Sequence, residues 1–204
     1  MKKRALELGG NAPFIVFDDA DLDAALPGLL IARFRNNGQT CVCANRIYVQ
    51  DAIYKAIAAT VAETVAKMKT CNGMDAGVSL GPLIDASALA KVEEHVAGAL
   101  AKGACRLQGH MPPHLGGTFY PATVLADVTP DVAVAREETF GPLAPLFRFK
   151  DKVDVIAQAN DTGFGLASYC YAENIARMFN VAEALEYGIE EFVEVRYVCP
   201  GGIV

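Results

Sequence analysis

The pattern of hydrophobic and polar positions changes along the chain between one typical of buried strands and one typical of amphipathic helices. Short apolar runs predict strands at 14–17, 47–49, 104–107, 123–125, 146–149 and 168–171. Apolar residues that recur every three to four positions predict helices at 24–35, 51–69, 85–102, 153–160 and 174–185. Because strands and helices alternate, we expect an α/β fold with a mostly parallel open sheet and helices on both faces.

Several residues mark the ends of these elements. Asp18, Asp19 and Asp21 are candidate N-caps for the helix at 24–35, and Pro27 in its first turns is expected to kink it. Gly103 ends the helix at 85–102. The stretch 108–117 is rich in Gly, Pro and His, which predicts an exposed loop.

Composition limits the class of protein. A chain of 204 residues, 52% of them hydrophobic, is long enough to bury a sizeable core as one large domain or a tight pair. The net charge of −6 argues against nucleic acid or an anionic membrane as the main partner. The first residues lead into Glu7 and two glycines rather than an apolar signal core, and we find no apolar segment long enough to span a bilayer. We therefore expect a soluble, cytoplasmic protein.

The cysteines carry no framework spacing. They are Cys41, Cys43, Cys71, Cys105, Cys170 and Cys199. A chain of this size does not need disulfides, so they are interpreted as reduced thiols. No metal site is expected, because one C-x-C with three distant histidines lacks a second pair of ligands.

The most informative stretch is 34–46, F-R-N-N-G-Q-T-C-V-C-A-N-R, which puts Cys41 between a predicted helix and a predicted strand, just after Gly38. A reactive cysteine attacks as its thiolate and needs backbone freedom to face a cleft, and Gly38 with its polar neighbours supplies that freedom. The alternative is an ordinary buried cysteine packed as a small hydrophobic side chain.

Residues 34–43 resemble the nucleophile motif of the aldehyde dehydrogenase superfamily, and are most similar to that of the succinate semialdehyde dehydrogenases. Two further motifs follow the family order: L-E-L-G-G at 6–10 and E-E-T-F-G-P at 137–142. The resemblance extends to 11–13, 81–84 and 160–167 and covers nearly the whole chain. Three matched motifs in order are a specific signal, whereas any one alone is weak.

The resemblance implies a reaction and two catalytic residues. Cys41 matches the thiol that attacks the aldehyde carbonyl, after which hydride passes to NAD or NADP and the thioester is hydrolysed. Glu7 matches the base that activates the water. A partly desolvated Glu7 would suit a general base, because desolvation raises the pKa of a carboxyl group. The alternative for Glu7 is a strand residue that faces solvent.

The resemblance also implies a cofactor site. Glu138 matches the glutamate that binds a ribose, and Phe140 matches the aromatic residue that contacts the nicotinamide end. A carboxylate can accept from both ribose hydroxyls, and an aromatic ring offers a flat face. Alternatively, Glu138 is a surface residue and Phe140 a core residue in a turn. Glu137 and Glu138 are adjacent, and only one of them can be well placed to bind a ribose.

Arg35 and Cys43 complete the candidate site. In the semialdehyde dehydrogenases that this chain resembles, the arginine matched by Arg35 holds the far carboxylate of the substrate, and its planar fork suits bidentate binding. The alternative is an arginine at a helix end that faces water. Cys43 is close enough to Cys41 for a strained, labile disulfide, which suggests a redox switch. Alternatively, Cys43 is a buried residue at the start of a strand.

The resemblance predicts the domain organisation: a catalytic domain at 1–189 and a carboxy-terminal oligomerisation strand or tail at 190–204. The alternating segment 191–199 predicts a final strand, which in the family pairs with a partner subunit, so a homo-oligomer is expected. The family's amino-terminal half, with its nucleotide-binding domain and an oxyanion-binding Asn, has no counterpart here, nor has a segment near 188–190. Two functions stay open: the catalytic domain of a semialdehyde dehydrogenase, or a cofactor-less fragment that is at most a slow thiol esterase.

Overall fold

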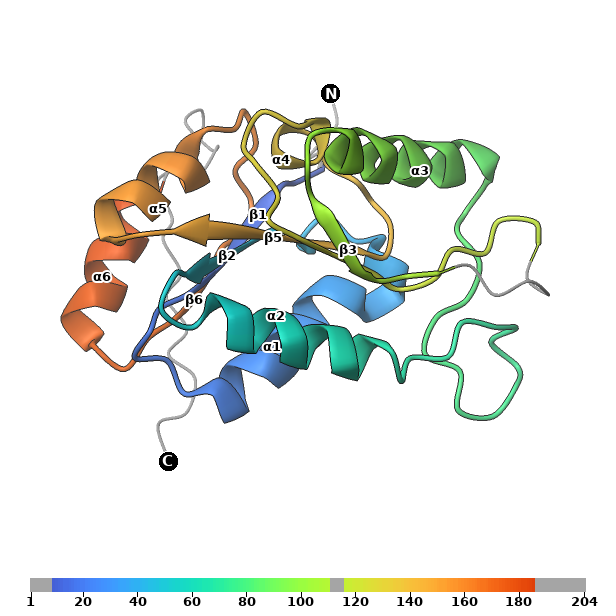
Figure 1. Cartoon of the computed structure of the whole chain (residues 1–204), viewed down its shortest axis with the longest axis horizontal. Helices are drawn as coiled ribbons and strands as arrows, with labels where there is room; N and C mark the ends of the chain where they lie inside the picture. The colour runs from blue at the N-terminus through green and yellow to red at the C-terminus, as the bar shows by residue number, and fades with distance from the viewer. Residues whose placement is uncertain (1–8, 111–115, 186–204) are drawn as a thin grey trace, which may run out of the picture.

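The computed structural model describes residues 9–110 and 116–185. Its main feature is a six-stranded sheet with the strand order β3-β4-β5-β2-β1-β6 (Figure 1). Within the described residues β3 pairs antiparallel with β4, and the other neighbouring strands pair parallel. The predicted α/β class with a mostly parallel sheet is therefore confirmed.

The strands are short and largely buried. Their bounds are Ala12–Val16 for β1, Ala44–Gln50 for β2, Cys105–Gln108 for β3, Thr123–Ala126 for β4, Leu143–Phe149 for β5 and Tyr169–Tyr171 for β6. Every residue of β1 is buried, as expected for a parallel strand covered on both faces. Its register pairs Phe14 with Ile47 of β2 on one side and with Tyr169 of β6 on the other.

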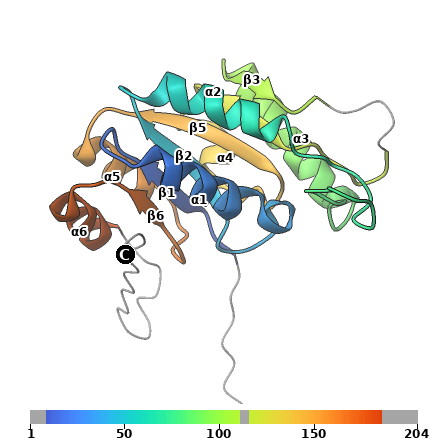
Figure 2. The ribbon, with the colours of Figure 1, turned by 90° about the horizontal axis from the view of Figure 1, so that it is seen from below.

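Helices cover both faces of the sheet (Figures 1 and 2). Their bounds are Leu22–Phe34 for α1, Tyr54–Val65 for α2, Ala86–Ala101 for α3, Ala133–Arg136 for α4, Lys152–Asn160 for α5 and Ile175–Ala184 for α6. One core packs α1 and α2 against Phe14 and Val16. The other packs α3, α4, α5 and α6 against Ile15, which points to the opposite face of β1, and against Phe17 just after the strand.

The helix ends follow from local hydrogen bonds. Among the three candidate caps, Asp21 accepts from two backbone N–H groups of α1, and Asp85 caps α3 where the sequence predicts it. The helix α1 continues past Pro27. The helix α2 is shorter than predicted, because the amphipathic pattern continues into the turns on either side of it. The short α4 was not predicted.

The chain reverses sharply after α1. The turn Arg35–Gly38 has three successive residues with positive φ: Asn36 at 50°, Asn37 at 60° and Gly38 at 72°. Asparagine and glycine are the residues that adopt this conformation most readily, which explains the N-N-G sequence. Asn37 also holds the turn in place, because its amide accepts from Gly81 N–H and donates to the carbonyl of Pro82.

In the part of the chain that the structure describes, no helix is long and apolar enough to cross a bilayer. Likewise, the described residues contain no cluster of three or more His, Cys, Asp or Glu that could hold a metal ion.

Candidate active site

The order of the strands brings the matched motifs together. The strands β5, β2, β1 and β6 are neighbours and run parallel, so the loops that precede them lie side by side along one border of the sheet. These loops are 137–142 before β5, 39–43 before β2, 9–11 before β1 and 161–168 before β6. Segments that are far apart in sequence therefore form one candidate active site.

Gly10 connects two of these loops. Its N–H donates to Oε1 of Glu138 at 3.0 Å, and its carbonyl accepts from the Asn45 side chain at 3.4 Å. A Cβ at this position would lie 2.3 Å from the carbonyl oxygen of Cys41, so a side chain larger than hydrogen does not fit. The backbone of Cys41 and the carboxylate of Glu138 thus contact the same residue.

Cys41 lies in the loop 39–43, which we call the Cys41 loop. Its thiol belongs to a partly exposed residue, as a reactive cysteine requires. The loop is closed by a hydrogen bond from Cys43 N–H to the carbonyl of Thr40 at 3.1 Å. The N–H of Cys41 has no hydrogen-bond partner among the described residues.

The structure separates the two adjacent glutamates. Glu138 is partly buried and faces Gly10, whereas Glu137 lies 3.4 Å from the His95 ring and its side chain is 59% exposed. Burial raises the pKa of Glu138, and the Gly10 N–H, Lys91 and Arg33 oppose this rise. Oε2 of Glu138 has no hydrogen-bond partner within the described residues, so it can accept from a ligand hydroxyl.

Phe140 has an unusual backbone. Its φ is 53°, in the left-handed region that is unfavourable for a bulky residue, and its side chain is partly exposed. The preceding Thr139 is buried and hydrogen-bonded to Nδ1 of His95 at 3.0 Å. Such strain persists where the surroundings hold a residue in place, and it is common at functional sites.

Because His95 is bonded to Thr139, we expect the stability of the segment around Phe140 to depend on pH. Burial lowers the pKa of His95 and the neighbouring Glu137 opposes this, so the folded chain binds a proton less readily than the unfolded one. The stability that the buried, neutral His95 contributes is therefore fully present above its unfolded pKa of about 6.5, and it falls as the pH drops below that value. We expect the free energy of unfolding in urea to decrease from neutral pH to about pH 5, with a smaller decrease in His95→Gln. An equal decrease of the free energy of unfolding with pH in wild type and in His95→Gln would contradict this assignment.

Two arginines near the Cys41 loop differ in kind. Arg35, the predicted substrate residue, is exposed, which leaves it open to an anion and also fits an arginine at a helix end. Arg33 is fully buried and donates to the carbonyls of Ala44 and Gly141 and to Asn45 Oδ1. Burial lowers the pKa of Arg33 to about 10, so it is still charged at neutral pH. Arg33 was not predicted as a site residue, since in sequence it resembles any charged residue near a helix end.

Cys43 is buried, with its Sγ 2.8 Å from Oγ1 of Thr40. Both Cys41 and Cys43 are free thiols in this structure. The redox switch between them stays a prediction. Two other predicted features, Glu7 and the strand at 191–199, lie outside the described residues.

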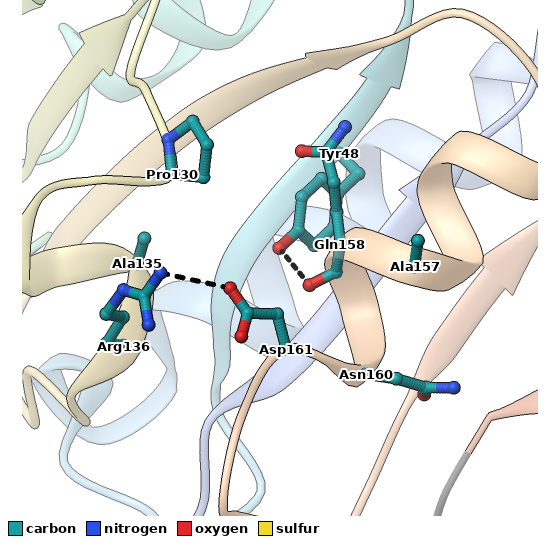
Figure 3. A pocket seen from close by; sticks show the side chains of 8 residues that line it. All are labelled: Tyr48, Pro130, Ala135, Arg136, Ala157, Gln158, Asn160 and Asp161. Carbon is teal, nitrogen blue, oxygen red and sulfur yellow. Dashed lines mark hydrogen bonds and ion pairs between the residues drawn. The ribbon is translucent and has the colours of Figure 1, made fainter.

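A cavity of about 530 Å³ lies between α4, α5 and β2, and none of the predicted site residues lines it (Figure 3). Arg136 and Asp161 form an ion pair of 3.2 Å at this cavity, and the Tyr48 hydroxyl donates to the carbonyl of Gln158 at 3.2 Å. The predicted site residues that the structure describes therefore lie in or next to the loops around Gly10 and not at this cavity.

Comparison with known proteins decides the family. The model of the aldehyde dehydrogenase family matches residues 1–194. The chain belongs to the aldehyde dehydrogenase family. The predicted resemblance is thereby confirmed.

Individual aldehyde dehydrogenases match strongly over part of their length. A glutarate-semialdehyde dehydrogenase of Pseudomonas aeruginosa is 54% identical over 235 residues, which cover 100% of this chain and 49% of the relative. A succinate-semialdehyde dehydrogenase (NADP(+)) of Escherichia coli K12 is 61% identical over 189 residues, or 93% of this chain and 39% of the relative. The crystal structure of succinate-semialdehyde dehydrogenase from Burkholderia pseudomallei has a TM-score of 0.87 at 57% identity, over 90% of this chain and 38% of that one.

This aldehyde dehydrogenase chain thus spans half or less of the length of the relatives it matches. The Pseudomonas alignment is also longer than the chain, 235 residues against 204, so the relative has residues within the aligned span that are missing here. This agrees with the prediction that a family segment is absent near 188–190, a region outside the described residues.

Proposed function

We propose that this chain is the catalytic part of an aldehyde dehydrogenase that oxidises succinate semialdehyde to the dicarboxylate. The observation that carries the proposal is that Gly10 contacts both the backbone of Cys41 and the carboxylate of Glu138. The thiol expected to bind the aldehyde and the carboxylate expected to bind the cofactor are thereby held in one site. The names of the relatives, which are dehydrogenases of succinate and glutarate semialdehyde, support the substrate class.

Cys41 begins the reaction. Its Sγ adds as a thiolate to the aldehyde carbon, which forms a C–S bond and puts negative charge on the former carbonyl oxygen. The N–H of Cys41, which has no partner among the described residues, is the donor available to that oxygen. After oxidation the acyl group is a thioester on Sγ, and we assign to Glu7 the activation of the water that hydrolyses it.

Glu138 and Phe140 are assigned to the cofactor. NAD or NADP, when bound, accepts the hydride. The residues fit its nicotinamide riboside end, because Oε2 of Glu138 is available to ribose hydroxyls and Phe140 offers a partly exposed ring. The name of the Escherichia coli relative includes NADP(+), whereas nothing in the described residues discriminates between the two cofactors.

Arg35 is assigned to the far carboxylate of the substrate. It is exposed, and it precedes the Cys41 loop by a single turn, Arg35–Gly38. A guanidinium group can hold a carboxylate through two parallel hydrogen bonds. We further propose residues 1–189 as the catalytic domain and 190–204 as a strand or tail through which copies of the chain associate.

The second candidate function is a fragment that lacks dehydrogenase activity and is at most a slow thiol esterase through Cys41. The observation in its favour is that the chain spans half or less of the length of its relatives. In this case the thiol would be acylated by an activated ester without any transfer of hydride.

One experiment separates the two candidates. The purified, reduced chain is mixed with succinate semialdehyde and NAD or NADP, beside Cys41→Ala, and the appearance of reduced cofactor is followed. Turnover that is lost in Cys41→Ala supports the dehydrogenase. Absence of turnover, with Cys41 still acylated by an ester, supports the fragment.

The assignment of Arg35 has its own prediction. If the chain turns over, we expect Arg35→Met to raise the KM for succinate semialdehyde about tenfold to a hundredfold, because a charged hydrogen bond to the carboxylate is lost. The KM for butanal, which has no carboxylate, should stay the same. An equal rise for both aldehydes would contradict the assignment.

A further inference from the structure

Tyr169 links the edge strand β6 to the Cys41 loop. Its hydroxyl donates to the carbonyl oxygen of Val42 at 2.7 Å, the usual length of an O–H···O hydrogen bond. The hydrogen bonds inside the loop come from the loop itself or from the residues just before it. Tyr169 instead reaches the loop from a strand 127 residues further along the chain.

The ring of Tyr169 is held in place by the sheet. It stacks on Phe14 of the neighbouring strand β1, with 5.7 Å between ring centroids and 29° between ring planes. Burial raises the pKa of the Tyr169 hydroxyl, the Cys43 and Cys41 thiols add to the rise, and Arg35 opposes it. The hydroxyl is thus close to the charges of the proposed active site as well as bonded to its backbone.

We propose that Tyr169 is a positioning residue, which fixes the Val42 peptide and so aims the Cys41 thiol and the Cys41 N–H at one reacting carbonyl. The proposal rests on the proposed function, since it takes Cys41 as the nucleophile. The bond that Tyr169 makes lies one residue after Cys41, on the peptide that joins Val42 to Cys43. The N–H of that same peptide, from Cys43, donates to the carbonyl of Thr40, which belongs to the peptide that carries the Cys41 N–H. Without the bond from Tyr169 this linked pair of peptides is held at one point fewer, and the N–H that should bind the oxyanion is less fixed in direction.

Tyr171 provides a matched control on the same strand. It also stacks on Phe14, at 5.1 Å between centroids, and burial also raises the pKa of its hydroxyl. Its hydroxyl lies against Gly28 of α1 and makes no hydrogen bond to the Cys41 loop. Tyr171→Phe therefore measures the effect of removing a partly buried hydroxyl from this strand, without a change to the loop.

Two reagents separate positioning from general damage. With p-nitrophenyl acetate, Cys41 Sγ forms a bond to the acyl carbon, the bond to the leaving oxygen breaks as nitrophenolate departs, and the thiol proton goes to solvent. This reaction passes through an oxyanion and needs the N–H of Cys41. Iodoacetamide reacts with the same thiolate at a saturated carbon, where no oxyanion forms, so it measures exposure and ionisation alone.

In Tyr169→Phe we expect the burst of nitrophenolate from Cys41 to slow about tenfold, as for the loss of one hydrogen bond. Alkylation of Cys41 by iodoacetamide should change by less than about twofold, because the thiol stays exposed. Tyr171→Phe should change neither rate. Thermal melting of both variants checks that they are folded.

Three outcomes contradict the proposal. Equal acylation rates in wild type and Tyr169→Phe would show that the hydrogen bond does not aim the site. A parallel fall with both reagents would indicate a merely structural role, as would an equal effect of Tyr171→Phe. If Cys41→Ala is acylated as fast as wild type, the proposed function itself is wrong, which the Cys41→Ala control reveals separately.

Discussion

Replacement of Gly10 by alanine is expected to lower the reactivity of Cys41 towards esters at least about a hundredfold. The added Cβ would lie 2.3 Å from the carbonyl oxygen of Cys41, and this neighbour is backbone, which cannot move aside as the end of a flexible side chain can. Either the Cys41 loop or the Gly10 peptide must shift, and the shift also disturbs the hydrogen bond to Glu138. Since a misplacement of about 1 Å can cost about a hundredfold in rate, we expect at least that loss in the nitrophenolate burst.

Gly163→Ala is the control for this substitution. Gly163 also lies in a matched motif, in the loop before β6, but a Cβ there meets nothing within 4 Å. The burst of nitrophenolate from Gly163→Ala should equal that from wild type. If Gly10→Ala is acylated within about threefold of wild type, the close approach of Gly10 and Cys41 is not what holds the site together.

Replacement of Arg33 by alanine is expected to have the largest effect on stability. Its guanidinium group is fully buried and bonds three oxygens at the starts of β2 and β5, those of Ala44, Asn45 and Gly141. Arg33→Ala removes a charged donor from each of these acceptors, although the Gly141 carbonyl keeps its bond from Leu143 N–H, and it also creates a cavity. We expect a loss of about 3–5 kcal/mol in the free energy of unfolding, measured in urea.

Arg35→Ala serves as the control, because Arg35 is two residues away and exposed. We expect its free energy of unfolding to stay within about 0.5 kcal/mol of wild type. Equal losses in the two variants would mean that the buried network around Arg33 does not stabilise the loops of the site. A small loss in Arg33→Ala alone would lead to the same conclusion.

Local patterns sufficed for much of the fold. The helix α3 lies where the sequence predicts it, because Asp85 caps its start and Gly103, with φ of 98°, follows its end. The helix α2 was predicted too long, because the turns that flank it place Ile53 and Met68, both partly buried, against the same core as the helix. The four-residue α4 was missed, since so short an element carries no period.

The candidate site was predictable only in its parts. The motifs identified Cys41, Glu138 and Phe140, but the meeting of Cys41 and Glu138 at Gly10 depends on the strand order, which places β1 beside β2 and β2 beside β5. Tyr169 carries no signal in sequence beyond that of a strand residue. Its hydrogen bond to Val42 arises because β6 pairs with β1, and that pairing is not visible in the spacing of residues.

The most direct test of the central claim, that Cys41 is the nucleophile, is to map which cysteine is acylated first by limiting p-nitrophenyl acetate. Cys105 is exposed, whereas Cys41 is only partly exposed. Cys170 is a poor competitor, because burial raises its pKa to about 12. Reactivity set by exposure alone would therefore favour Cys105. We predict that mass spectrometry of peptides prepared at mildly acid pH finds the acetyl group on Cys41. Acetylation of Cys105 at an equal or higher rate would contradict the account.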